Sequence, residues 1–287
     1  MSKTLHPLEQ LHLLNQDIKD IELISPLIVV GGQAVAYWVW RYQNMFTEEI
    51  LANKKLFSFD IDYMCAKEDI AKIAQAWDLP FNLNTCGQPP SIALLRTQHS
   101  NGSIKTYQGA SFYNEQIDAA NIIDIIDTPA GFTRREIHTH LNRFCEPYFE
   151  DSRAVYILNP IACLRARLAN INGKFKRSSL SFEIERVRSL LVTIICFLFK
   201  KISNDNFKEG ISYFTLFKET ITNSDVAQID AEHDLNLYTV FNYFIKHREL
   251  LDNQSVNPDF FEKFLPYSLE SYRRLVEHKK SIISRRK

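Results

Sequence analysis

The sequence lacks several features that would point directly to one class of protein. It has no net charge, because 34 basic residues balance 34 acidic ones, so no global field recruits nucleic acid or a membrane surface. It has no long hydrophobic run: the longest, residues 190–199, is interrupted by Thr193 and falls well short of the ~20 residues that span a bilayer. It also has no internal repeat and no low-complexity segment.

Paired cysteines are absent as well. The five cysteines are odd in number and widely spaced, without a Cys-x-x-Cys pair, and buried free thiols in a reducing cytoplasm are the simplest account of them. Residues 1–7 lack the apolar run of a signal peptide. With 45% hydrophobic and 24% charged residues, the chain is expected to be a cytoplasmic globular protein with a sizeable core and no membrane contact.

An acidic stretch, residues 57–64, is the most informative part of the chain. Read as a strand, it places Ser58, Asp60, Asp62 and Met64 on one face and apolar residues on the other. Neighbouring carboxylates repel, so a strand keeps them together mainly when a cation lies between them. Oxygen ligands favour Mg²⁺ or Mn²⁺, with nucleotide phosphates completing the shell. A solvated edge strand that carries two acids is the other interpretation.

A glycine turn comes before this stretch. The apolar run of residues 27–30 stops at Gly31 and Gly32, where a helical pattern begins. A strand, a glycine turn and a helix start together present backbone N–H groups and a helix N-terminus to an anion. A phosphate cradle next to metal-binding carboxylates indicates nucleotide chemistry.

A third carboxylate is expected in the β-branched run of residues 121–127. Asp124 lies in its middle, where a charge is costly unless it is paired or bound to a metal. Asp127 lies at its end, where it can begin the turn through Thr128 and Pro129. Asp124 is therefore the preferred candidate, and Asp127 is the alternative.

The hydrophobic pattern predicts the other elements. Helices are expected over residues 8–23, 34–42, 67–77 and 132–144, a hairpin around Asn101 and Gly102 with arms 92–95 and 104–107, and a last core strand over 155–158. Asn159 is a good N-cap, and Pro160 a good first residue, for the next helix. From Glu183 onward the pattern is helical. Glu136, His138 and His140 lack the spacing of a metal-binding helix pair and are interpreted as exposed polar residues.

In this order, Gly31, Gly32, Ser58, Asp60, Asp62 and a later Asp resemble the nucleotidyltransferase superfamily, which shares a catalytic core with DNA polymerase β. Gly-Gly-Gln-Ala followed by Ser-x-Asp-Ile-Asp is most similar to bacterial domains related to abortive-infection toxin nucleotidyltransferases. The resemblance implies an α+β fold: a mixed-sheet nucleotidyltransferase core with flanking helices over residues 1–159, followed by an all-helical C-terminal bundle over residues 160–287.

The resemblance also implies roles for individual residues. The catalytic, metal-binding residues would be Asp60, Asp62 and Asp124, holding Mg²⁺ or Mn²⁺. The nucleotide-binding residues would be Gly31, Gly32, Ser58 and Arg167. Arg167 matches a basic residue that faces the triphosphate in the family. The other interpretation of Arg167 is a surface residue on an amphipathic helix.

The implied activity is transfer of a nucleoside monophosphate from an NTP such as ATP to a hydroxyl acceptor. The acceptor would be tRNA, another RNA or a protein side chain, and the protein would be the toxin of a toxin–antitoxin system with a cognate antitoxin as partner. Two alternatives stay open. One is a catalytically silent module of the same fold that binds nucleotide or recruits a partner. The other is nuclease or phosphodiesterase chemistry on the same acids.

Overall fold

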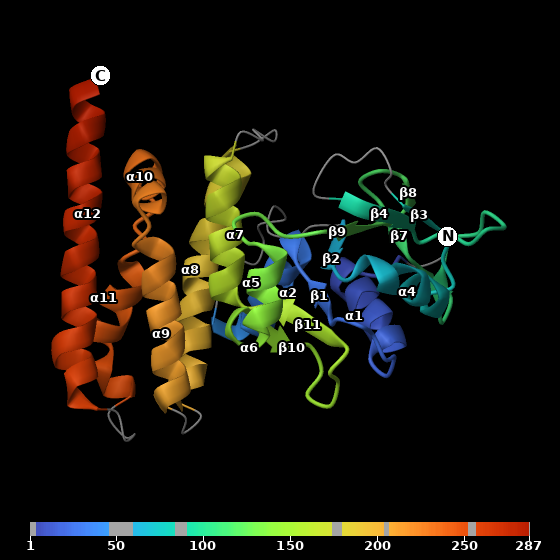
Figure 1. Cartoon of the computed structure of the whole chain (residues 1–287), viewed down its shortest axis with the longest axis horizontal. Coiled ribbons are helices and arrows are strands. Elements are labelled where there is room, and N and C mark those ends of the chain that lie inside the picture. Colours follow the sequence, from blue (N-terminus) through green and yellow to red (C-terminus); the bar gives the residue numbers. More distant parts are fainter. Residues whose placement is uncertain are drawn as a thin grey trace. The chain divides into compact units, whose positions relative to one another are not determined.

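The computed structural model describes residues 4–45, 60–83, 91–173, 180–203, 207–251 and 257–286 (Figure 1). The chain divides into two compact units: unit 1 comprises residues 1–41 and 54–163, and unit 2 comprises residues 42–53 and 164–287. The division falls inside helix α7 (Pro160–Asn172), slightly later than the boundary at 159/160 expected from the sequence. The architecture is α+β, with strands confined to unit 1 among the described residues.

Unit 1 is built on a mixed sheet. Among the described residues it has seven strands in the order β10-β11-β1-β2-β9-β4-β3. They are β1 (Leu27–Val29), β2 (Ile61–Met64), β3 (Phe81–Leu83), β4 (Ser91–Arg96), β9 (Ile122–Ile126), β10 (Cys145–Pro147) and β11 (Val155–Leu158). β1 is parallel to β11 and antiparallel to β2, whereas β2 and β9 are parallel. β-Branched residues dominate β1 and β9, which suits strands at the buried centre of a sheet.

One face of this sheet packs against α1 (Pro7–Ile18) and the residue after α4 (Ile70–Ala76). Tyr63 on β2 donates its hydroxyl hydrogen to Asn15 Oδ1 over 2.7 Å, and its ring lies 5.4 Å from that of Trp77. Trp77 donates from its indole nitrogen to the carbonyl of Leu14 over 2.9 Å. These contacts fix the orientation of β2 and therefore of the face that carries Asp62.

Helix α1 ends at Ile18, so the predicted helix over residues 8–23 is too long. In the segment that follows, the buried Asp69 carboxylate accepts hydrogen bonds from the backbone nitrogens of Ile24 and Ser25 at 3.0 and 3.1 Å. Asp69 belongs to the turn η3 (Lys67–Asp69), which precedes α4. The segment between α1 and β1 is thus held by a residue distant in the sequence, which local periodicity does not register.

The other helices of unit 1 lie close to the predicted positions, except that the single helix expected over residues 132–144 is divided into two at His140. They are α2 (Gly31–Arg41), α5 (Arg134–Thr139), α6 (Leu141–Phe144) and the start of α7. Trp38 of α2 is buried and donates to the carbonyl of Leu158 over 2.7 Å. Asn159 caps α7 as predicted, because its Oδ1 accepts from the backbone nitrogen of Ala162 over 2.9 Å.

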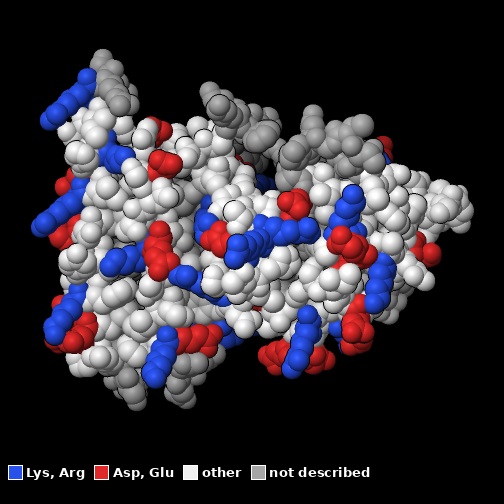
Figure 2. Space-filling model, viewed as in Figure 1, with Lys and Arg blue, Asp and Glu red and all other residues white. Residues whose placement is uncertain are grey.

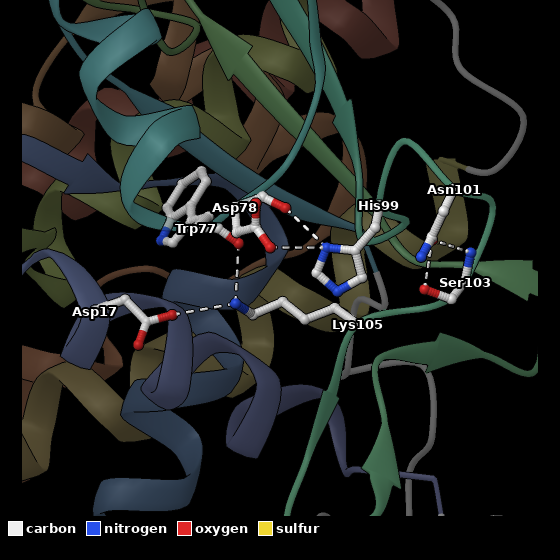
Figure 3. A network of polar contacts seen from close by, with 7 residues as sticks. All are labelled: Asp17, Trp77, Asp78, His99, Asn101, Ser103 and Lys105. Carbon is white, nitrogen blue, oxygen red and sulfur yellow. Dashed lines mark hydrogen bonds and ion pairs between the residues drawn. The ribbon is translucent and has the colours of Figure 1, made fainter.

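The predicted turn at Asn101 and Gly102 is confirmed, but its predicted arms are wrong. Lys105 donates from its backbone nitrogen to the carbonyl of Thr97, whereas β4 pairs with β3 and β9. The Lys105 ammonium fastens this loop by donating to the carbonyl of Trp77 over 2.9 Å, and it lies 3.4 Å from the Asp17 carboxylate (Figure 3). The short strands that follow are β5 (Thr106–Tyr107), β6 (Ala110–Ser111), β7 (Tyr113–Asn114) and β8 (Ala119–Ala120).

Unit 2 is helical throughout its described residues, as predicted from Glu183 onward. Its elements are η1 (Gln43–Met45), most of α7, α8 (Leu180–Ser203), α9 (Phe207–Ile221), α10 (Ser224–His233), α11 (Thr239–Lys246), η4 (Arg248–Leu250), the π-helix η5 (Phe260–Phe264) and α12 (Leu265–Arg286). Phe214 and Phe244 pack edge to face in its core, with ring centroids 4.8 Å apart. The buried Asp230 accepts from the Tyr272 hydroxyl over 2.8 Å and so connects α10 to α12.

The described cysteines are free and buried: Cys65, Cys145, Cys163 and Cys196. Burial raises the pKa of the Cys65 thiol to about 12, which keeps this side chain a neutral thiol at physiological pH. Cys86 lies outside the described residues. In the described part of the chain, every helix is too short or too polar to cross a membrane.

Candidate active site

Asp62 and Asp124 lie side by side on neighbouring strands. β2 and β9 run parallel, with Asp62 directly opposite Asp124. The residues on either side of these two acids are fully buried: Ile61, Tyr63, Ile123 and Ile125. Because side chains alternate along a strand, both carboxylates share the opposite face of the sheet, where they are half-buried. Like charges at directly opposed positions repel, so this pair favours a cation or a proton between them.

Gly31 passes directly against the Asp62 side chain. The backbone nitrogen of Val30 donates to the carbonyl of Asp62 over 3.0 Å, which brings the end of β1 alongside β2. Gly31 has φ +65°, and a Cβ atom there would lie 1.9 Å from Asp62 Oδ2. Any other residue would therefore strain the backbone and collide with the carboxylate. Helix α2 begins at Gly31, so its positive end lies beside Asp62.

Asp60 is an exposed residue immediately before β2. Partial burial and the negative charge of Asp124 raise the pKa of its carboxyl group. Asp60 is therefore near enough to Asp124 for the two charges to interact. Asp60 is thus a third acid near the pair of Asp62 and Asp124. When ionised, it adds to the negative potential around them.

Ser91, the first residue of β4, contacts Asp124. Its hydroxyl donates to Asp124 Oδ1 over 2.5 Å. The pairing of β4 with β9 is irregular between Ser91 and Ala93, which indicates a β-bulge at the start of the strand. Nothing in the spacing of the sequence pointed to Ser91, because the contact depends on this irregularity.

The structure separates the two candidates for the third carboxylate. Asp124 is the register partner of Asp62, whereas Asp127 follows β9, is exposed and lies 3.5 Å from Arg134 Nη1. Arg134 also donates to the carbonyl of Cys65, the residue after β2. Asp127 therefore belongs to a polar cluster at the ends of the two strands and Asp124 to the carboxylate pair.

Arg167 belongs to unit 2, and its side chain is almost completely buried. Its Nη1 atom lies 3.1 and 3.3 Å from the two carboxylate oxygens of Glu183 on α8. The alternative interpretation of Arg167 as a surface residue is therefore wrong, because the guanidinium is part of a buried ion pair. Contact between Arg167 and a nucleotide stays a prediction.

The structure describes one of the two remaining residues that were predicted to bind the nucleotide. Gly32 is buried as the second residue of α2, directly after the turn that approaches Asp62. Ser58 lies outside the described residues, so its expected position two places before Asp60 on the acidic strand stays a prediction.

The acids fit Mg²⁺ or Mn²⁺ in kind, because carboxylate oxygens are the ligands that these ions prefer. Asp62 and Asp124 supply two such groups in register. Among the described residues, however, no group of three or more His, Cys, Asp or Glu side chains is placed to hold a metal ion together, which also applies to Glu136, His138 and His140. Mg²⁺ is commonly held by one or two carboxylates with waters and substrate phosphates, so the pair meets the minimum requirement.

Comparison with known proteins adds little to this geometry. No protein-family model matches the sequence, and no curated protein matches it. A solved structure that aligns with the chain is that of JHP933 from Helicobacter pylori, with 12% sequence identity and a TM-score of 0.37, covering 99% of this chain and 96% of that one. A similarity at this TM-score supports no conclusion about fold or function.

Sequence reasoning named three of the residues that meet in this candidate site. Asp62, Asp124 and Gly31 were predicted from the acidic strand, the β-branched run and the glycine turn, and the structure brings these three residues together. The sequence did not identify Ser91, and it did not predict that Gly31 would contact the Asp62 side chain. Both contacts depend on how strands far apart in sequence lie next to each other.

Proposed function

We propose that this protein is a metal-dependent nucleotidyltransferase that moves a nucleoside monophosphate from an NTP to a hydroxyl acceptor. The observation that carries the proposal is the register pairing of Asp62 with Asp124 beside the Gly31 turn. Two adjacent carboxylates provide for a divalent cation, and a glycine turn at a helix start provides for phosphates. A nucleoside triphosphate with its bound divalent cation would occupy both of these places.

The residues of the chain have distinct parts in this chemistry. Asp62 and Asp124 would hold Mg²⁺ or Mn²⁺, and Asp60 adds negative potential beside them. A bound divalent cation would stabilise charge on the reacting phosphate and on the attacking oxygen. Gly31, having no side chain, leaves the start of α2 open to the triphosphate. The acceptor hydroxyl loses its proton to the solvent as its oxygen attacks the α-phosphorus. The bond between the α-phosphorus and the oxygen that bridges to the β-phosphorus breaks, and pyrophosphate leaves with that oxygen.

The acceptor we propose is the hydroxyl of a tRNA, of another RNA or of a protein side chain. A role as the toxin of a toxin–antitoxin system in the cytoplasm, with an antitoxin as partner, is part of the same proposal and rests on the resemblance of Gly31, Gly32, Asp60 and Asp62 to that family. On the face of the molecule drawn in Figure 2, acidic and basic side chains are interspersed. Acceptor recognition by local contacts is therefore expected, rather than attraction by a large single-sign field.

Labelled nucleotides test the proposal. The protein is incubated with Mg²⁺ or Mn²⁺, a total tRNA pool and an NTP labelled on either the α- or the γ-phosphate. Transfer of the α-label alone, lost in Asp62→Asn, is the expected result. Asp127→Asn is the matched control, because it removes a nearby carboxylate that is outside the pair and should retain transfer. Transfer of the γ-label would instead indicate phosphoryl transfer.

A second candidate is a nucleotide-binding module that does not catalyse transfer. It is favoured by one observation, that the described residues contain no group of three metal-ligating side chains. The same experiment separates the candidates. NTP binding that requires Asp62, without transfer of either label and without pyrophosphate release, would support the silent module. Metal-dependent loss of RNA in the absence of NTP would indicate nuclease chemistry.

A further inference from the structure

The start of β4 contains a bulge that changes the direction of one side chain. Along β4, Leu95, Leu94 and Ala93 pair regularly with Ile123, Asp124 and Ile125. The next partner, Ile126, is opposite Ser91 rather than Ile92, so one extra residue is accommodated between Ser91 and Ala93.

This extra residue decides which face Ser91 occupies. In a regular strand Ser91 would share the buried face with Ala93 and Leu95, because residues two apart point the same way. Opposite Ile126, it lies instead on the face that carries Asp124, where its hydroxyl reaches Asp124 Oδ1 over 2.5 Å. Bulges commonly re-aim a side chain next to an active site.

The hydrogen bond has a defined direction and a defined effect. An ionised carboxylate only accepts hydrogen bonds, so the Ser91 hydroxyl donates and Asp124 Oδ1 accepts. A short bond from a hydroxyl to a carboxylate is among the stronger hydrogen bonds in proteins. It restricts rotation of the Asp124 carboxyl group and occupies Oδ1. Among the described residues, Oδ2 accepts no hydrogen bond and keeps its lone pairs for a cation.

We propose that Ser91 is a positioning residue for Asp124, which it holds in the orientation needed to bind the divalent cation with Asp62. This inference rests on the proposed function, since it assigns Ser91 a part in the same cation site. The backbone pairing that holds β4 to β3 and β9 does not involve the hydroxyl. Removing the hydroxyl should therefore affect the cation site more than the fold.

The test compares variants that differ in one hydroxyl group. Thr and Val have nearly the same shape and both suit a strand, so Ser91→Thr keeps the donor and Ser91→Val removes it. Ser91→Ala removes it with the least steric change. Ser103→Ala is the matched control, because Ser103 also donates its hydroxyl to a side-chain oxygen, Asn101 Oδ1, over 2.7 Å, in the turn drawn in Figure 3.

Mn²⁺ affinity, measured by the loss of the free-ion paramagnetic resonance signal, is the primary readout, and urea unfolding is measured in parallel. Loss of an outer-shell partner of a metal ligand typically costs 10–100-fold in affinity, so Ser91→Ala and Ser91→Val should each bind Mn²⁺ about 10-fold more weakly. Ser91→Thr and Ser103→Ala should bind like the wild type. In Asp124→Asn, adding Ser91→Ala should have no further effect on affinity, because Ser91 is proposed to act on the cation through Asp124.

The outcomes separate this inference from the proposed function. Wild-type affinity in both Ser91→Ala and Ser91→Val would overturn the role of Ser91 and leave the carboxylate site standing. Weak binding in Ser91→Thr as well would also overturn it, because the hydroxyl would not be the cause. A wild-type protein that binds neither Mn²⁺ nor an NTP with Mn²⁺ would contradict the proposed function itself, and the role of Ser91 with it.

Discussion

The absence of a side chain at Gly31 leaves room for the side chain of Asp62. A Cβ atom at Gly31 would lie 1.9 Å from Asp62 Oδ2, and the backbone there has φ +65°. The sequence predicted a glycine turn from local pattern. The sequence did not predict that Gly31 contacts Asp62. Gly31 follows β1 and Asp62 lies on β2, so the contact depends on how these two separated segments lie next to each other in the folded structure.

Gly31→Ala should therefore lower the free energy of unfolding more than an ordinary Gly→Ala change at a positive φ. Gly102 offers the matched control, because it has φ +85° and no atom within 4 Å of the position of a Cβ. Gly102→Ala should lower the free energy of unfolding by about 1 kcal/mol, the usual cost of left-handed backbone. Gly31→Ala should cost at least about twice as much and should also weaken Mn²⁺ binding, as measured by urea unfolding and metal titration. Equal losses in both variants would contradict the close approach.

The raised pKa of Asp60 should give the stability of the protein a specific pH dependence. Because burial and the charge of Asp124 raise its pKa on folding, the folded protein holds the Asp60 proton more tightly than the unfolded chain does. Asp60 therefore stabilises the fold at acidic pH, and this contribution is lost as the pH rises through the raised pKa. Asp60→Asn, which is neutral at all pH values, should be more stable than the wild type at about pH 7.

This gain in Asp60→Asn should disappear below the ordinary carboxyl pKa of about 4, where Asp60 is protonated in both states. Urea unfolding of both proteins across the pH range is the measurement. Asp127→Asn is the control, and it should show no comparable gain at neutral pH, because Asp127 is paired with Arg134. A wild type that is more stable than Asp60→Asn at neutral pH would refute the assigned electrostatics.

At the scale of elements, the sequence predicted what local chemistry determines. The cap at Asn159, the turn at Asn101 and Gly102 and the strand around Asp124 all carry their signals within a few residues. The predictions were wrong where partners distant in sequence decide the outcome. The segment after α1 is held by Asp69, which accepts from the backbone of Ile24 and Ser25, and β3 and β9 are the partners of β4 in place of residues 104–107. The bulge at the start of β4 brings Ser91 to the face of Asp124, which strict alternation along a strand does not indicate.

Asn159 should be worth more than an exposed cap. Its Oδ1 accepts from Ala162, and its Nδ2 donates to the carbonyl of Arg143 over 2.8 Å, which also ties α7 to α6. Asn159→Ala should lower the free energy of unfolding by about 2 kcal/mol, from the lost cap and the unsatisfied buried groups. The comparison is Asn223→Ala, which removes the exposed cap of α10 and should cost about 1 kcal/mol. Calorimetry or urea unfolding measures both, and a smaller loss for Asn159→Ala would argue against the double role.

At the scale of the whole molecule, the sequence indicated a mixed-sheet unit followed by a helical one, and the structure has both. The periodicity changes from strands to helices along the chain, so this organisation was readable. The division inside α7 was not, because a continuous helix gives no local signal that its neighbours belong to two cores. The buried ion pair of Arg167 with Glu183 was likewise hidden from periodicity.

Ligand binding should be visible in the stability of the whole chain. A ligand that binds only the folded state raises the stability by about 2.7 kcal/mol at a concentration 100 times its dissociation constant. An NTP with Mn²⁺ should therefore raise the melting temperature of the wild type but not of Asp62→Asn. Asp127→Asn should respond like the wild type. An equal shift in Asp62→Asn would show that the nucleotide binds elsewhere.

The central claim is that the carboxylate pair of Asp62 and Asp124 supports nucleotidyl transfer, and mass spectrometry tests it most directly. The protein and a total tRNA pool are each weighed after incubation with each NTP and Mg²⁺ or Mn²⁺, beside Asp62→Asn and Asp127→Asn. The account predicts an added nucleoside monophosphate, on RNA or on protein, that persists in Asp127→Asn and vanishes in Asp62→Asn. An added mass that persists in Asp62→Asn, or bound NTP with no added mass anywhere, would contradict it.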